Sequence, residues 1–234
     1  MLELYHNDMS SCAQKVRAVL EEKGLEWTGH HLNLRAGDAQ RPDYLKLNPN
    51  ALVPTLVHDG TPIIESTVIS EYLEDAFPEA VPLRPADALG RSRMRWWTQQ
   101  LDESVHTATV SLSMCIAFRH QHLEKTPEKL EAYLNAVPNP DRKQRLRSYV
   151  HEGYASPWFE PALRRYVKLL EDMHKTLGSG AWLAGSTFSL AETAYMPYMT
   201  RLTHLGLDEL IDARPRVREW TDRLFQRPSY KRAI

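Results

Sequence analysis

The sequence predicts an α/β domain followed by an all-helical domain in a chain of 234 residues. Both strand-like alternation and helical spacing of apolar residues occur in the first 77 residues, whereas only helical spacing occurs after Pro82. Between these regions, residues 78–85 contain three prolines, which lack an N–H donor and favour an extended linker. We therefore predict a first domain over residues 1–78, a linker over 79–88 and a helical domain over 89–234.

The first domain is expected to begin with a βαβ unit. Leu2–Tyr5 alternates apolar and polar residues as a half-buried strand does. A helix over Ala13–Lys23 follows, and Gly24 ends it. The next strand is expected over residues 27–34, and this connection is long enough for the two strands to be parallel.

The rest of the domain is expected to be a short helix, a hairpin and a longer helix. Pro42 begins the short helix, and Pro54 opens a strand that the Asp59–Gly60 turn joins to Thr61–Ile64. Ser66 is a candidate N-cap for the last helix. The predicted order is β-α-β-α-β-β-α.

Six helices are predicted after the linker. The first is long, with Trp97, Leu101, Val105 and Leu112 on one face. Proline at the first helical position and a Ser189–Glu192 capping box mark two later helix starts. We expect Arg227–Pro228 to end the last helix. The predicted ranges are 91–122, a helix beginning at 127, one resuming at 141, 159–177, one after Ser189 and 215–225.

Composition limits the classes of function. The formal net charge is −1 and there is no Lys/Arg block, so neither nucleic acid nor a membrane surface is an expected partner. No apolar run reaches the roughly 20 residues that span a bilayer, and no signal peptide is apparent. Cys12 and Cys115 are the only cysteines, too few for a disulfide framework. We expect a cytoplasmic protein with reduced thiols.

The most informative run of residues is Met9–Arg17, which places Ser10, Ser11 and Cys12 where the first strand becomes the first helix. The N–H groups at a helix N-terminus have no partner within the helix, and the helix dipole is positive there. Such a position stabilises a thiolate and lowers the pKa of its thiol. The run therefore predicts a site for a sulfur anion.

Together with three further motifs, this run resembles the cytosolic glutathione transferases. The other motifs are Val53–Pro54 before the third strand, Glu65–Ser66 after the fourth, and Trp182–Gly185 leading into Phe188–Ala191. The Ser-Ser-Cys order is most similar to the zeta class and to bacterial glutathione-dependent dehalogenases and β-etherases. The resemblance implies an α/β thioredoxin-like N-terminal domain plus an all-α C-terminal helical domain.

The resemblance also implies glutathione as cosubstrate and assigns partners to its γ-glutamyl and cysteinyl parts. Ser66 and the helix N-terminus would bind the γ-glutamyl carboxylate, and Glu65 its amine. A cis peptide at Val53–Pro54 would turn the Val53 backbone toward the cysteinyl unit. From the residues alone, Ser66 is also explained as a plain N-cap, and Pro54 as a trans proline at the start of an edge strand.

For the glycine carboxylate, Gln40 and Arg41 are the candidates. Many relatives have a polar residue just before the Val-Pro pair, whereas this chain has Leu52. The glycine end is therefore expected to be held loosely or by Gln40 alone.

Ser10, Ser11 and Cys12 are the predicted catalytic residues. The thiol of free glutathione has a pKa of about 8.5, so a hydroxyl that donates to the sulfur creates the nucleophile. The resemblance assigns this role to Ser10, and Ser11 is the alternative one residue away. Tyr5 is interpreted as a core or rim residue.

Cys12 has three interpretations. It shares a helix face with Val16 and Val19, which suits a small structural thiol. It is also placed to form a mixed disulfide with glutathione and release a reduced product, as in the reductive dehalogenases that the chain resembles. A third interpretation is a redox-sensitive residue without a catalytic role.

The electrophile pocket is expected between the two domains. One wall would come from the long helix. Separately, the pairs His30–His31 and His120–His122 do not have the spacing of a metal site. The resemblance further implies a homodimer in which Asp102 reaches the amine of the partner's glutathione. The residues proposed for the pocket are Val105, Thr109, Ser113, Met114, Phe118, Tyr195, Tyr198 and Tyr230.

The predicted function is conjugation of the glutathione thiolate to a small hydrophobic electrophile. One alternative is a Cys12-dependent thiol reductase, similar to a reductive dehalogenase or a dehydroascorbate reductase. The other is a protein that has kept the fold and glutathione binding without turnover. Variants Ser10→Ala and Cys12→Ala would separate the two enzymatic readings.

Overall fold

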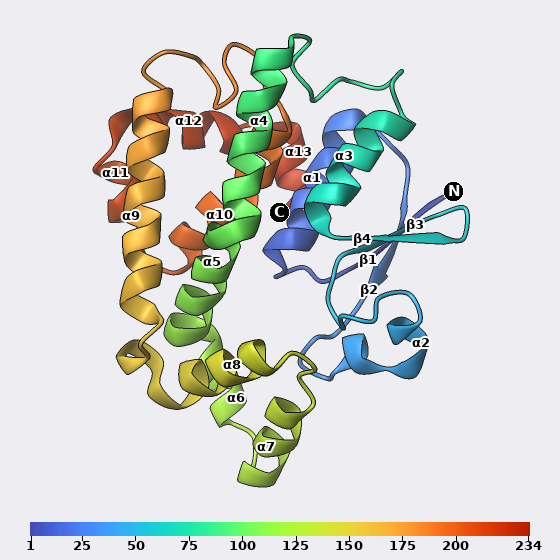
Figure 1. Cartoon of the computed structure of the whole chain (residues 1–234), viewed down its shortest axis with the longest axis vertical. Coiled ribbons are helices and arrows are strands. Elements are labelled where there is room, and N and C mark those ends of the chain that lie inside the picture. The colour runs from blue at the N-terminus through green and yellow to red at the C-terminus, as the bar shows by residue number, and fades with distance from the viewer.

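A four-stranded mixed sheet and a group of helices make up the computed structural model, which describes residues 1–234 (Figure 1). The strands are β1 (Leu2–His6), β2 (Thr28–His31), β3 (Thr55–His58) and β4 (Thr61–Ile64). Their order in the sheet is β2-β1-β3-β4, with β1 parallel to β2 and the other two pairs antiparallel. This is the thioredoxin-like arrangement that the sequence predicted.

The elements of the first domain follow local signals. In α1 (Ser11–Lys23), Ser10 is the N-cap and Gly24 ends the helix with a φ of 66°. The remaining helical elements of this half are η1 (Asp38–Gln40), α2 (Pro42–Leu45) and α3 (Ser66–Ala76). The N-cap of α3 is Glu65, and Ser66 is the first helical residue, so the predicted capping role of Ser66 is wrong by one position.

After residue 87, all the regular elements are helices. A continuous helical rod runs from Ala88 to Leu123, longer than predicted at its start, and a short helix that the sequence did not indicate follows α10. The elements are α4 (Ala88–Gln100), η2 (Leu101–Val105), α5 (His106–Ser113), η3 (Met114–Phe118), α6 (Arg119–Leu123), α7 (Pro127–Asn135), α8 (Pro140–Glu152), η4 (Gly153–Ala155), α9 (Phe159–Thr176), α10 (Leu190–His204), α11 (Asp208–Asp212), α12 (Pro215–Phe225) and α13 (Pro228–Ala233).

Two π-helical turns, η2 and η3, interrupt this rod. Each π turn adds a residue to the turn and so changes the direction in which later side chains point. The predicted stripe of Trp97, Leu101, Val105 and Leu112 is nevertheless buried. The change of phase matters for the polar residues, because His106 follows η2 directly.

The end of the chain also differs from the prediction. Helix α12 ends at Phe225 as expected, but Pro228 then begins α13 instead of ending all helical structure. Proline at the first helical position is a start signal, because it lacks only an N–H that would be unpaired. Helix α13 packs on α1, and the Arg17 Nε donates to the Ala233 carbonyl at 2.8 Å.

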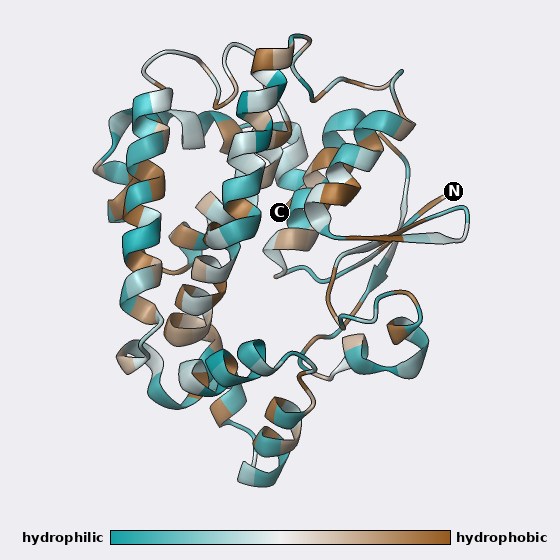
Figure 2. Cartoon of the chain, viewed as in Figure 1, coloured by the Kyte–Doolittle hydropathy of each residue, from teal (hydrophilic) through white to brown (hydrophobic).

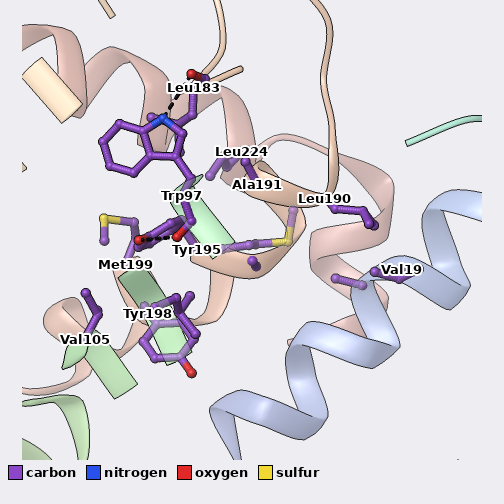
Figure 3. Packing of buried hydrophobic residues seen from close by; sticks show 14 of the residues in the cluster. Val19, Trp97, Val105, Leu183, Leu190, Ala191, Tyr195, Tyr198, Met199 and Leu224 are labelled. Atoms are coloured by element: carbon purple, nitrogen blue, oxygen red, sulfur yellow. Dashed lines mark hydrogen bonds between the residues drawn. The ribbon is translucent and has the colours of Figure 1, made fainter. Parts of the chain in front are cut away.

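One large core joins the two halves of the molecule. Apolar residues from β1, α1 and α3 belong to the same cluster as residues from α4, α9, α10 and α12. Figure 3 shows its centre, where the Trp97 indole donates to the Leu183 carbonyl at 3.0 Å and the Tyr195 hydroxyl donates to the Trp97 carbonyl. Along α9, apolar and hydrophilic residues alternate as expected for a helix with one buried face (Figure 2).

The motif around residues 182–192 closes this core. Glu192 accepts hydrogen bonds from the Ser189 N–H and from the Leu183 N–H, which confirms the predicted capping box at the start of α10. Helix α10 packs directly on α1. The helical half therefore supports the helix that carries Ser10, Ser11 and Cys12. No helix is long and apolar enough to cross a bilayer.

Candidate functional site at the start of α1

Ser10 lies at the N-terminal end of α1 with its side chain partly exposed. Its Oγ accepts a hydrogen bond from the Ala13 N–H at 3.3 Å, and no group of the chain accepts its hydroxyl proton. Ser11, the first helical residue, is 7% exposed. Of the two predicted hydroxyls, that of Ser10 is the more accessible to a ligand.

The loop before Ser10 is held from several sides. The Asn7 side chain donates to the Leu32 carbonyl at 2.9 Å, and the Gln14 side chain donates to the Asp8 carbonyl at the same distance. From α10, Arg201 donates to the Met9 carbonyl at 2.6 Å while it is only 4% exposed. The position of Ser10 therefore depends on both halves of the molecule.

Cys12 contacts two polar side chains of the helical domain. Its Sγ lies 3.5 Å from the His106 Nδ1 and 3.7 Å from the Tyr198 hydroxyl. The His106 Nδ1 and the Tyr198 hydroxyl are 3.0 Å apart, so the three groups form one cluster. Cys12 and His106 are both partly exposed, whereas Tyr198 is buried.

This cluster favours the Cys12 thiolate. Burial acts to raise the pKa of Cys12, but the positive charges of His106 and Lys15 and the hydrogen bonds from His106 and Tyr198 outweigh it and lower the pKa to about 6. The negative sulfur in turn raises the pKa of His106. The arrangement favours a thiolate–imidazolium pair, the usual form of a reactive cysteine. Cys115, by contrast, is fully buried, and burial raises its pKa to about 11.

Sequence reasoning missed His106. Its partner lies 94 residues away, and it follows a π-helical turn that the apolar spacing does not reveal. No local signal in the sequence identifies it.

A second polar cluster joins α1, α3 and the long helical rod. The buried Lys15 ammonium donates to the Thr67 hydroxyl and lies 3.6 Å from the Asp102 carboxylate. The Thr67 hydroxyl donates to Asp102 at 2.9 Å. Asp102 is thus placed beside the Glu65–Ser66 turn of its own chain, and its contact with a partner's glutathione stays a prediction.

At the Glu65–Ser66 turn, Glu65 has a positive φ of 71°, a conformation that costs about 1–3 kcal/mol in a residue other than glycine and is found mostly at functional sites. Ser66 is 7% exposed at the N-terminus of α3. The free N–H groups of this first turn suit a carboxylate.

The Val53–Pro54 peptide bond is cis, as the resemblance implies. Neither the N–H nor the carbonyl of Val53 bonds to another group of the chain, so both are available to a peptide ligand. The preceding Leu52 is 40% exposed, and its carbonyl accepts hydrogen bonds from Asn48 at 3.0 Å and from Tyr44.

The two candidates for the glycine carboxylate differ in their surroundings. Gln40 ends the short helix η1 and lines a cleft with residues of α7. Arg41 is exposed, and its guanidinium pairs with Asp38 at 3.0 Å. Tyr5 packs at 4.5 Å on the His30 ring.

Most residues predicted to line an electrophile pocket are buried. Val105, Thr109, Ser113, Met114 and Tyr195 are each less than 9% exposed. Phe118 and Tyr230 are partly exposed. Tyr198 is buried as well, but its hydroxyl contacts the Cys12 sulfur, so Tyr198 is part of the site. His106, at the next position after Val105, is the residue of this helix that faces Cys12.

No group of three or more histidine, cysteine, aspartate or glutamate side chains could hold a metal ion.

Comparison with known proteins gives matches to both halves of the chain. Residues 9–76 match the family model described as "Glutathione S-transferase, N-terminal domain", and residues 159–228 match "Glutathione S-transferase, C-terminal domain". Protein LigF of Sphingobium sp. (strain NBRC 103272 / SYK-6) is 29% identical over 98% of this chain and 91% of its own. The crystal structure of beta-etherase LigF has a TM-score of 0.91, with 99% of this chain and 98% of that chain covered.

Two further relatives match along nearly the whole chain. Glutathione S-transferase TCHQD of Arabidopsis thaliana is 29% identical over 100% of this chain and 89% of its own. The 2,5-dichlorohydroquinone reductive dechlorinase of Sphingobium indicum (strain DSM 16412 / CCM 7286 / MTCC 6364 / B90A) is 28% identical over 99% of this chain and 82% of its own.

Proposed function

The chain belongs to the glutathione S-transferase superfamily, and from this premise we propose that it forms the thiolate of glutathione at Ser10 and transfers it to a small hydrophobic electrophile. The observation that carries the proposal is the Ser10 hydroxyl, which is partly exposed at the N-terminus of α1 with its proton unused. At the coarser level, the chain is a glutathione-dependent enzyme of this family.

Each part of glutathione has a proposed partner. Ser66 and the N-terminus of α3 bind the γ-glutamyl carboxylate, and Glu65 binds the amine. The free N–H and carbonyl of Val53 bind the cysteinyl peptide. Gln40 binds the glycine carboxylate, with no help from Leu52. The cysteinyl unit is the middle of the tripeptide. With the two ends of glutathione bound as proposed, its sulfur lies at the start of α1.

The proposed reaction is a nucleophilic displacement. Ser10 donates to the sulfur, and the dipole of α1 favours the thiolate further. The thiolate forms a bond to carbon, and the leaving group departs with the electron pair. One relative is named a beta-etherase and another a reductive dechlorinase, which supports an electrophilic carbon that bears an oxygen or a chlorine leaving group.

Two variants test this proposal. We expect Ser10→Ala to lower kcat with chlorodinitrobenzene about a hundredfold, the typical effect of losing one such donor. Cys12→Ala should retain conjugation. Ser10→Asp is the matched control, because aspartate keeps the N-cap of α1 but its carboxylate only accepts hydrogen bonds, so it should retain stability and lose activity. Conjugation by Ser10→Ala at the rate of the unmodified enzyme would contradict the proposal.

A second function is favoured by the contact between Cys12 and His106. In this reading, the Cys12 thiolate attacks the glutathionyl sulfur of a mixed disulfide, forms a Cys12–glutathione disulfide and releases the other thiolate. A second glutathione thiolate then attacks that disulfide, releasing glutathione disulfide and regenerating Cys12. Loss of activity in Cys12→Ala and His106→Ala, with activity retained in Ser10→Ala, would favour this function.

We also propose that the enzyme is a homodimer. Val68 of α3 and Trp96 of α4 are 55% and 49% exposed, and an Arg95–Glu71 ion pair of 3.2 Å joins the same two helices. Two such exposed apolar side chains on neighbouring helices are typical of a surface that a second copy covers. Light scattering of the native enzyme and of Trp96→Glu would test this, because a charge at that position should produce monomers.

A further inference from the structure

A cleft of about 330 Å³ lies between the segment after β2 and helix α7, and it has a strongly basic lining. Arg35 and Gln40 line it from the first domain, and Lys125, Lys129 and Tyr133 line it from the helical domain. In Figure 1, α7 is the lowest helix and α2 lies to its upper right. The cleft is at the lower end of the size range of small-molecule sites.

The three cations of this cleft form no ion pair within the chain. Arg35, Lys125 and Lys129 take part in none of the ion pairs of the structure. The nearby Asp38 carboxylate is already engaged, because it pairs with Arg41 at 3.0 Å and accepts from the Asn33 N–H at 2.8 Å. Like charges from two domains thus face one cleft without a direct carboxylate partner.

His122 does not line the cleft itself but packs on Tyr133, which does. It is 7% exposed, and its Nδ1 has no hydrogen-bond partner, which is uncommon for a buried polar atom. Its ring lies 4.8 Å from that of Tyr133, which in turn has the Lys125 ammonium at 5.8 Å. Burial and the charges of Lys125 and Arg35 lower the pKa of His122, so both cations act on the same place.

An anion with an attached ring matches this lining. The cations would bind a carboxylate, and the Tyr133 ring would pack against an aromatic body. Glutathione supplies one carboxylate near Gln40, but two of the cations and the ring come from the helical domain, the side on which the second substrate is expected. The volume also exceeds what a single carboxylate fills.

We propose that this basic cleft binds a carboxylate of the second substrate, so that the enzyme prefers acidic aromatic electrophiles to neutral ones. The inference rests on the proposed function, since it concerns the selectivity of that reaction. Lys125 and Lys129 are then specificity-determining residues. The glycine carboxylate of glutathione is the other possible source of the anion, and the experiment distinguishes the two.

The test compares two electrophiles, chloronitrobenzoate and its neutral counterpart chlorodinitrobenzene, with native enzyme and the double variant K125A/K129A. The measured quantity is the ratio of kcat/KM for the acidic to that for the neutral electrophile. We expect this ratio to fall by about tenfold for each charge removed. Lys175→Ala, an exposed lysine of α9 without an ion pair, is the matched control and should leave the ratio unchanged.

Equilibrium binding of chloronitrobenzoate in the absence of glutathione separates this proposal from the proposed function. Native enzyme should bind the benzoate more tightly than the double variant, and salt should weaken the binding. If the enzyme turns over neither electrophile but shows this difference in binding, the proposed conjugation reaction is wrong, whereas the proposed binding of a carboxylate in the cleft is supported. Equal binding by both proteins, or an unchanged ratio, would overturn the cleft.

The ester of the glycine carboxylate of glutathione identifies the other source. If the double variant raises the KM for glutathione but not for the ester, the cleft binds glutathione itself and the proposal is wrong. If the KM values for both thiols are the same in native enzyme and variant while the ratio of kcat/KM for the acidic to the neutral electrophile falls, the carboxylate belongs to the second substrate.

Discussion

At the scale of single residues, the cluster of Cys12, His106 and Tyr198 is the most specific chemical feature of the molecule. The sulfur lies 3.5 Å from the imidazole, close enough for a charge-assisted hydrogen bond that involves sulfur. Ser10, two residues earlier, presents its hydroxyl to the same region from the helix N-terminus. The hydroxyl proposed to hold the glutathione sulfur and the thiol proposed for disulfide exchange therefore lie within one turn of α1.

Alkylation of Cys12 should follow the titration of its thiol. With a pKa of about 6, the rate with iodoacetamide should rise as the pH passes 6 and become constant above about pH 7, because the thiolate is the reacting form. In His106→Asn the half-maximal pH should move up toward about 8.5, the value for an ordinary cysteine. Mass spectrometry of the labelled peptide measures the rate.

Cys115 is the internal control for this experiment. It is fully buried, so it should stay unlabelled while the protein is folded. Half-maximal labelling of Cys12 near pH 8.5 in the native enzyme would contradict the thiolate–imidazolium pair.

At the scale of elements, the site depends on how α10 and the long helical rod meet the start of α1. The π turn η2 directs His106 toward Cys12, while α10 supplies both Tyr198 and Arg201. Arg201 also donates to the Ser113 hydroxyl at 3.2 Å and lies over the Phe118 ring at 5.1 Å. Its guanidinium is thus fixed before it reaches the Met9 carbonyl.

Arg201 is a positioning residue by this geometry, so Arg201→Met should act through Ser10. We expect kcat for conjugation to fall about tenfold, as when a charged hydrogen bond is lost, with little change in KM. The pKa of enzyme-bound glutathione, measured from its thiolate absorbance, should rise toward the free value of about 8.5.

Arg201→Lys is the conservative control, since lysine keeps one donor and the charge. It should restore part of the rate. If Arg201→Met loses stability but leaves the pKa of bound glutathione unchanged, its role is structural only.

At the scale of the whole molecule, the two halves share one core and are tied together at the linker. The Lys23 ammonium of α1 pairs with the Glu74 carboxylate of α3 at 2.7 Å, and both are at most 5% exposed. Glu74 also accepts from the Leu83 N–H, and Lys23 donates to the Val81 carbonyl, so the pair holds the linker as well. Leu83 in turn accepts from the Leu190 N–H at the start of α10.

Removing one member of this buried pair should be costly. Glu74→Gln is expected to lower the free energy of unfolding by about 3–5 kcal/mol, because Lys23 is left buried without a counter-charge. Glu71 lies on the same helix as Glu74 and pairs with the more exposed Arg95 of α4. Glu71→Gln should therefore cost no more than about 1 kcal/mol. Urea denaturation followed by circular dichroism gives both values, and equal losses in the two variants would argue against a special role for the Lys23–Glu74 pair.

Local signals in the sequence were sufficient for most of the elements. Gly24, the Asp59–Gly60 turn and the Ser189–Glu192 capping box act over a few residues, so spacing and residue type identify them. The same holds for the position of Ser10 at a helix N-terminus. The N-cap of α3 and the start of α13 were misjudged, because a cap is shifted by one residue and a proline serves equally to end or begin a helix.

The sequence by itself thus determined the two-part fold and the motifs for glutathione, whereas only the tertiary structure decided what surrounds Cys12 and where the free positive charges meet. His106 is 94 residues from Cys12, and Arg35 reaches the same cleft as Lys125 and Lys129 from another domain. Such pairings depend on how helices pack and on the phase that π turns impose. A pKa likewise depends on the charges and burial around a group, which the identity of the residue does not contain.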